Sequence, residues 1–145
     1  MGVEELEKQV IKHFTEDKWS CSEAVLLAMA EYWGVESALI PRIATPFRGG
    51  LCGTQQVCGA VTGGLMAIGI RLGRDGGSED SALCVETGKA YMAAVREAYG
   101  ELTCRGITDC DFNDATAHER FRKVRRGEVC VPLVAFCCRW LAEHC

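Results

Sequence analysis

Ten cysteines among 145 residues are the side chains of this sequence with the most chemistry to offer. A thiolate binds soft metal ions and attacks disulfides, so these residues could hold a metal centre or exchange electrons. The cellular compartment decides whether they form disulfides instead. The opening residues, MGVEELEKQVIKHFTEDK, are charged and amphipathic and hold no apolar core before a cleavage site. We therefore expect a cytoplasmic protein whose thiols stay reduced and serve metal binding or redox chemistry.

Four of the cysteines lie at the ends of predicted helices. Cys21 and Cys58 fall in the first or second turn of two helices, Cys130 falls just before another, and Cys104 falls just after one. Unpaired N–H groups and the helix dipole lower the pKa of a thiol at a helix start, so three of these positions favour the thiolate. The alternative is that each cysteine is a small buried hydrophobe.

Four of the other six cysteines form two groups. Cys52 and Cys110 each lie six positions from one of the first four, in glycine-containing connectors, and either could replace a ligand. Neither spacing is the Cys-x2-Cys of zinc ribbons or thioredoxin-like motifs. Cys84 and Cys137 lie on apolar helix faces, so we expect them in the core.

Composition, charge and the remaining polar residues exclude several functions. A chain of 145 residues fits one domain, 1–145, and its net charge of −4 argues against nucleic-acid binding. The longest apolar stretch, 57–70, is too short to span a membrane. The three histidines are dispersed and are expected at the surface, and no nucleotide-binding fingerprint occurs. The basic run HERFRKVRR, 118–126, is expected to be a solvated helix face, or else a docking patch for an acidic electron-transfer protein.

Hydrophobic periodicity and capping residues predict the elements that position these cysteines. We expect an all-α fold, a single compact bundle of five or six helices. The first predicted helix carries Val3, Leu6, Val10, Ile11 and Phe14 and stops before Trp19. The others are one opened by a Ser20–Glu23 capping box and closed by Gly34, one from Thr54 to about Gly73, one from Ser78 to Gly100, one from Asn113 or Asp114 to Gly127, and a last with Pro132 in its first turn.

The third predicted helix contains four glycines, Gly59, Gly63, Gly64 and Gly69. Each costs roughly 1 kcal/mol of helix stability relative to alanine, so we expect a compensating close approach by another helix or by a cofactor. This helix is expected to be the buried, glycine-rich centre of the bundle. Its small residues could also mediate self-association into a homo-oligomer.

Together these residues resemble the redox-active proteins named for their cysteine pattern, C_GCAxxG_C_C. The motif of that family is present as Cys58-Gly59-Ala60-Val61-Thr62-Gly63, with Cys21 before it in CSEAVL and Cys104 and Cys130 after it in CRGITDCDF and GEVCVPLV. The resemblance covers nearly the whole chain. The family is similar to the cysteine-bearing portion of split-Soret cytochromes, which implies a helical fold and favours an iron–sulfur centre. No Cys-x-x-Cys-His occurs, so covalent haem is not implied.

The leading hypothesis is a redox protein that transfers electrons through an iron–sulfur cluster held by Cys21, Cys58, Cys104 and Cys130. Gly59 and Gly63 would leave room for the cluster and free N–H groups for its sulfides. A second hypothesis is a metal-free thiol–disulfide protein, with Cys58 or Cys21 attacking and Cys52 as resolving partner. A third is a structural zinc site or a helical interaction module. Nothing in the sequence identifies an organic substrate, so enzymatic activity is left open.

Overall fold

The computed structural model describes residues 1–145 as seven α-helices, one 3-10 helix and one π-helical segment, with no strand. The all-α prediction is confirmed. The expected count of five or six helices is too low because residues 104–108, predicted to be a connector, form a short helix. The elements are α1 (Val3–Thr15), α2 (Cys21–Tyr32), η1 (Arg42–Phe47), α3 (Gly59–Leu72), α4 (Ala82–Tyr99), α5 (Cys104–Thr108), α6 (Ala115–Arg120), η2 (Phe121–Cys130) and α7 (Val131–His144).

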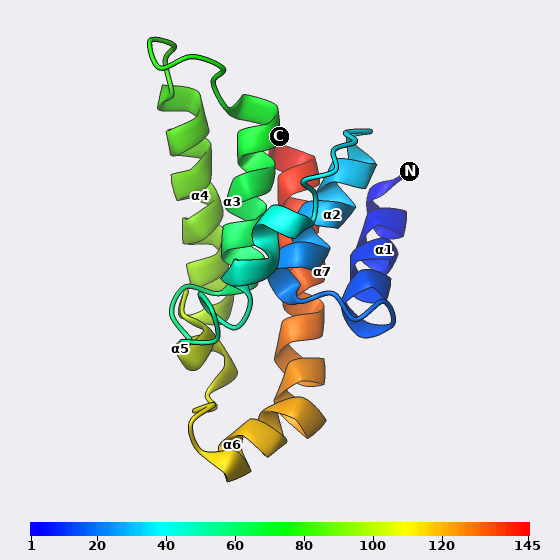
Figure 1. The fold of residues 1–145 in the computed structure, drawn as a ribbon, viewed down its shortest axis with the longest axis vertical. Helices are drawn as coiled ribbons and strands as arrows, with labels where there is room; N and C mark the ends of the chain where they lie inside the picture. The colour runs from blue at the N-terminus through cyan, green and yellow to red at the C-terminus, as the bar shows by residue number, and fades with distance from the viewer.

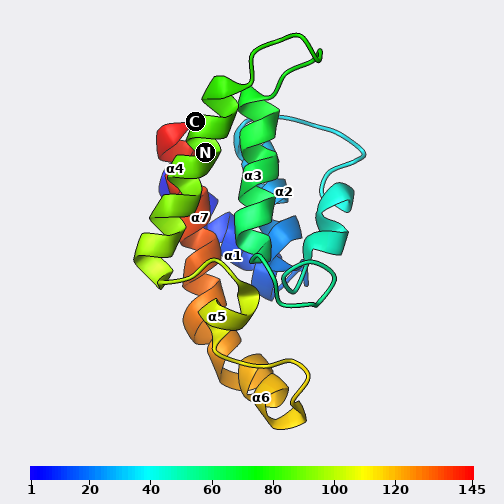
Figure 2. The same ribbon diagram turned by 90° about the vertical axis from the view of Figure 1, so that its left-hand side faces the viewer.

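The five longest helices lie roughly along one axis and pack in a bundle (Figure 1). Helix α2 packs against α1, α3 and α7, while α4 covers α3 from the outside. Helices α5 and α6 lie together at one end, below the bundle, and the α3–α4 loop projects from the other end (Figure 2). None of the helices is both long enough and apolar enough to cross a membrane.

The core lies between these five helices because each buries one apolar stripe. Leu6 and Val10, one turn apart on α1, are fully buried, as is Met29 of α2. Tyr91 of α4 is the largest fully buried side chain, and its hydroxyl donates a 2.7 Å hydrogen bond to the Ala60 carbonyl. This bond satisfies the one polar atom that Tyr91 brings into the core.

Close packing explains why α3 tolerates its glycines. A β-carbon at Gly63 would lie 2.5 Å from the Ser22 carbonyl oxygen, and one at Gly64 would overlap the Tyr91 ring. The backbone of α3 therefore touches α2 on one side and the Tyr91 side chain of α4 on the other. Only Gly69 on this helix has open space around it.

Several predicted boundaries need correction. Helix α3 begins at Gly59, not after Thr54, and α4 begins at Ala82, not at Ser78. Gly127 does not end a helix: α6, η2 and α7 follow one another without a break, and the Val131 amide donates to the Arg126 carbonyl in the five-residue pattern of a π-helix. The capping box at the start of α2 is present as predicted, with the Ser20 hydroxyl 2.6 Å from Glu23.

Candidate functional site

One cavity of about 390 Å³ is lined by Cys21, Cys58, Cys104 and Cys130. These cysteines come from the first residue of α2, the N-cap of α3, the first residue of α5 and the last residue of η2. Cys58, Cys104 and Cys130 are buried, and Cys21 is half-buried. The structure thus gathers four thiols from positions 21 to 130 of the sequence around one cavity.

Cys21 and Cys58 meet because the first turns of α2 and α3 are in direct contact. The missing side chain at Gly63 lets the α3 backbone touch Ser22, the residue after Cys21. At Gly59 a β-carbon would lie 2.5 Å from the Cys21 sulfur, so this sulfur occupies the space that glycine leaves. Gly59 lines the cavity, whereas Gly63 does not line it and makes the helix contact behind it.

Cys58 and Cys104 are placed side by side by a short antiparallel pairing of the backbone before α3 and before α5. Val57 and Thr103 form an isolated bridge. The Cys58 amide donates to the Leu102 carbonyl at 2.8 Å, and the Cys104 amide donates to the Gln56 carbonyl at 2.6 Å. The pairing fixes the two thiols relative to each other. It also engages both of these amides in hydrogen bonds to backbone carbonyls.

Cys130 reaches the cavity from within a continuous helical run. It ends η2, a ten-residue π-helical segment, and leads into α7. The wider turns of a π-helix change which residues face the core, and such segments are frequent at functional sites. Cys130 therefore does not precede a free helix start, as the sequence suggested, and no unpaired N–H groups of a first turn surround it.

The pKa values of the four thiols are shifted from the ordinary value in different directions. The pKa of Cys21 is lowered to about 7, first by a hydrogen bond from the Cys58 thiol and then by the amides of Ser22 and Gly49. Burial raises the pKa of Cys104 to about 11 and that of Cys130 to about 12. The pKa of Cys58 is raised because its thiol donates to Cys21 and is itself buried. The expected thiolate preference thus holds for Cys21 and is wrong for Cys58 and Cys130. The hydrogen bond to Cys21, and then burial, keep Cys58 protonated, and at Cys130 loss of hydration outweighs the helix dipole.

Gln55 supports the cysteine wall and was missed by the sequence analysis. Its buried side-chain amide donates to the Cys110 carbonyl at 2.7 Å and contacts the Cys104 sulfur at 3.8 Å, and its oxygen accepts from the Phe112 amide at 2.7 Å. Its φ of 59° places it in the left-handed region, which is costly for a residue other than glycine. Nothing in the local sequence marks it, because all three partners lie about fifty residues further along the chain.

The remaining cysteines lie outside the cavity wall. Cys52 is exposed, and Cys110 is buried near Cys104 but is not among the lining residues. Cys137 is fully buried in the core, as predicted. Cys84 is half-buried and packs against the core. No disulfide is present among the ten cysteines.

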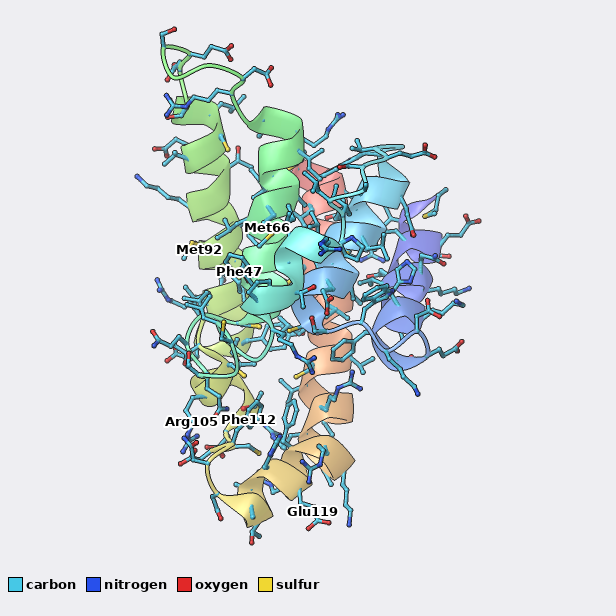
Figure 3. The ribbon with its side chains drawn as sticks, viewed as in Figure 1. Phe47, Met66, Met92, Arg105, Phe112 and Glu119 are labelled. Carbon is cyan, nitrogen blue, oxygen red and sulfur yellow. The ribbon has the colours of Figure 1, made fainter.

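Another part of the cavity lining consists of aromatic and basic side chains. Phe112 stacks on His118 with ring centroids 4.7 Å apart, and its side chain extends into the space beside the helical run that follows α6 (Figure 3). The lining residues that carry an aromatic ring or a basic group are Phe14, Lys18, Trp19, Arg48, Phe112, His118, Phe121, Arg122 and Arg126. The basic run 118–126 is therefore not uniformly a solvated face, since four of its members, His118, Phe121, Arg122 and Arg126, line the cavity.

Two histidines correct the expectation that all three lie at the surface. His13 is buried between two carboxylates, 2.8 Å from Asp17 and 2.9 Å from Glu31. His118 lines the cavity. Only His144 is exposed, at the end of α7.

The lining of the cavity includes the type of donor that iron–sulfur clusters use. Four thiols are the usual ligands of such clusters, and the cavity offers more space than a single ion needs. Gly59 has no side chain, and a larger residue at this position would fill part of that space. No group of three or more Cys, His, Asp or Glu side chains converges on a single point as the ligands of one metal ion would.

Residues 19–144 match a protein family described as "Putative redox-active protein (C_GCAxxG_C_C)". The match spans most of the 145 residues, so the chain belongs to this family. No curated protein and no solved structure matches the chain.

Proposed function

We propose that this member of the redox-active family transfers electrons through an iron–sulfur cluster bound in the cavity by Cys21, Cys58, Cys104 and Cys130. The observation that carries the proposal is that four thiols from four separate elements line one cavity. A core packed only for stability has no need to direct them to a shared space, because a cysteine there serves as a small apolar side chain. Cys137 and Cys138 on α7 are examples of that simpler role, since both are fully buried.

The surrounding protein would hold the cluster and influence its potential. A bound cluster would supply a one-electron redox centre, with a potential that depends on hydrogen bonds to sulfur and on burial. The Gly49 amide hydrogen-bonds to the Cys21 sulfur and helps to lower its pKa. The Gln55 amide hydrogen-bonds to the Cys104 sulfur and opposes the rise in pKa that burial causes there. Both interactions stabilise negative charge on sulfur, so we expect them to raise the potential.

Visible and electron paramagnetic resonance spectroscopy of anaerobically purified protein tests this proposal. We expect a brown protein whose visible absorption bleaches on reduction by dithionite. A colourless protein that binds zinc at one ion per chain would favour a structural metal site instead.

A metal-free thiol–disulfide function is the second candidate, and the contact between Cys21 and Cys58 favours it. Cys21 has a pKa of about 7, so about half of it is the reactive thiolate at neutral pH. With oxidised glutathione, Cys21 would attack one sulfur and release one glutathione thiolate, and Cys58 would then displace the second glutathione to form a Cys21–Cys58 disulfide. Cys52 does not line the cavity, so Cys58 replaces it as the proposed resolving partner. A mass loss of two hydrogens per chain, absent in Cys58→Ser, would identify this reaction.

The proposed setting is the cytoplasm, where thiols remain reduced. An acidic electron-transfer protein is the proposed partner, and Arg120, which is exposed and does not line the cavity, is available to steer it. Self-association through α3 would have to use its exposed end near Gly69, since Gly63 and Gly64 are already packed within the chain.

A further inference from the structure

The cavity is lined by cations and aromatic rings as well as by the four thiols. Lys18, Arg48, Arg122 and Arg126 all line it, and neither Asp nor Glu does. This concentration of positive charge occurs in a protein whose net charge is −4. The contrast points to a ligand that carries negative charge.

None of the four cations forms an ion pair, although Arg48 is near enough to Glu23 to help lower the pKa of that carboxyl. Six other lysine and arginine side chains do form ion pairs: Lys12, Lys89, Arg105, Lys123, Arg125 and Arg139. Arg126 is held in place by its contacts with Phe14, whose carbonyl accepts a 2.9 Å hydrogen bond and whose ring lies 3.9 Å from the guanidinium carbon. Arg122 lies 3.4 Å from the His118 ring nitrogen. The guanidinium groups at this wall are therefore available to an anion from outside the chain.

The rings beside these cations supply an apolar surface. Phe112 packs against both His118 and Phe121. The centroid of its ring lies 4.7 Å from the centroid of each of theirs. Trp19 is half-buried and also lines the cavity. A volume of about 390 Å³ is in the range of pockets that hold small organic molecules.

We infer that the cavity binds a small organic anion, with its acidic group at Arg122 and Arg126 and its apolar body against Phe112 and Phe121, in the same cavity that the four cysteines line. The inference rests on the proposed function only for its consequence, namely that such a molecule would lie beside the redox centre. Binding itself depends on the cation and ring wall. The two proposals can therefore fail separately.

Isothermal titration of anaerobically purified protein with benzoate tests this inference, with benzyl alcohol and inorganic phosphate as the matched ligands. Benzoate combines charge and ring, benzyl alcohol has the ring alone, and phosphate has the charge alone. We expect benzoate to bind at millimolar concentrations or below, and each of the other two to bind roughly tenfold more weakly, since each lacks one kind of contact. Added salt should weaken benzoate binding.

The variants Arg122→Gln and Lys123→Gln form a matched pair. Both residues are exposed neighbours on η2 and both changes remove one positive charge, but only Arg122 lines the cavity. Arg122→Gln should weaken benzoate binding roughly tenfold and Lys123→Gln by less than about twofold. Arg126→Lys, which keeps the charge but not the fork of donors, should weaken it by an intermediate factor.

Three outcomes would overturn the inference: no saturable binding of benzoate, equal weakening by the two glutamine variants, or an effect of Arg122→Gln only on reduction by an acidic redox protein. The last outcome would assign Arg122 to a docking surface. Iron and sulfide content measured on the same preparations separates this failure from failure of the cluster proposal.

Discussion

The Cys21 sulfur occupies the space that a β-carbon would fill at Gly59, at a distance of 2.5 Å. Helix α3 can therefore start beside Cys21 only if residue 59 is glycine. The same contact leaves the Cys21 thiol directed into the cavity next to Cys58. The glycine of the family motif thus has a steric explanation that does not depend on helix propensity.

Gly59→Ala should displace Cys21 and abolish binding of the cofactor, because the added methyl group and the sulfur cannot share this space. Gly69→Ala is the matched control, since it lies on the same helix with open space around it. That change should keep the cofactor and raise the free energy of unfolding by roughly 1 kcal/mol. Metal analysis and urea denaturation measure both effects. Full metal content in Gly59→Ala would contradict the steric argument.

Serine replacements should divide the cysteines by whether they line the cavity. Cys21, Cys58, Cys104 or Cys130 changed to serine should each reduce bound iron severely, because a serine hydroxyl is a far weaker ligand for iron than a thiolate. Cys52→Ser and Cys110→Ser should retain it, since neither thiol lines the cavity. Cys137→Ser should also retain it while losing about 1 to 3 kcal/mol of stability through a buried hydroxyl.

Loss of iron in Cys110→Ser but not in Cys104→Ser would show that Cys110 replaces Cys104 as a ligand. Full iron content in all four cavity variants would refute the ligand assignment. Circular dichroism of each variant establishes that the helices are intact, which separates loss of a ligand from loss of the fold.

Gln55→Ala should lower the free energy of unfolding by about 1 to 3 kcal/mol, because it leaves the buried Cys110 carbonyl and the half-buried Phe112 amide without their partner. The neighbouring Gln56 is exposed, and Gln56→Ala should change stability by less than about 0.5 kcal/mol. Urea denaturation of both variants provides the comparison. Equal stabilities would mean that water replaces the bonds of Gln55.

Alkylation of the metal-free protein should report the pKa of Cys21. The thiolate is the reactive form, so its rate of reaction with iodoacetamide should rise with pH and level off above the pKa of about 7. Burial raises the pKa of Cys104 to about 11, so this thiol should stay unreactive over the same range. Peptide mass spectrometry follows each site separately. A Cys21 rate that still rises steeply at about pH 9, the usual region for a free thiol, would contradict the lowered pKa.

The same shift has a consequence for stability with a definite sign. Because the folded pKa of Cys21 lies below its value of 9.0 in the unfolded chain, the unfolded state holds more protons between about pH 7 and 9. The contribution of Cys21 to the stability of the metal-free protein should therefore increase with pH across this window and be lost as pH falls through about 7. Cys21→Ser should remove that dependence.

Local signals in the sequence predicted the parts of the fold that depend on neighbouring residues. The Ser20–Glu23 capping box and the left-handed Gly100 at the end of α4 are both present, because each needs only its own turn of helix. The start of α3 could not be predicted in the same way. Residues 55 and 56 are held in an irregular conformation by bonds to residues 104–112, and no local pattern records such distant partners.

The candidate site shows the same division. Its four cysteines could be selected from their positions near helix ends and from the family pattern. The basic and aromatic wall could not be predicted, because the π-helical segment turns Arg122 and Arg126 toward the cavity in a run that resembles a solvated face. The raised pKa of Cys58 follows first from its hydrogen bond to Cys21 and then from burial, and that of Cys130 follows from burial. Both depend on residues far along the chain.

The central claim is that four cavity thiols hold an iron–sulfur cluster, and the iron and acid-labile sulfide content of anaerobically purified protein tests it most directly. The account predicts that both are present in equal amounts per chain, and that both are lost together in Cys130→Ser but not in Cys52→Ser. Protein that contains neither iron nor sulfide, even after anaerobic reconstitution with both, would contradict it.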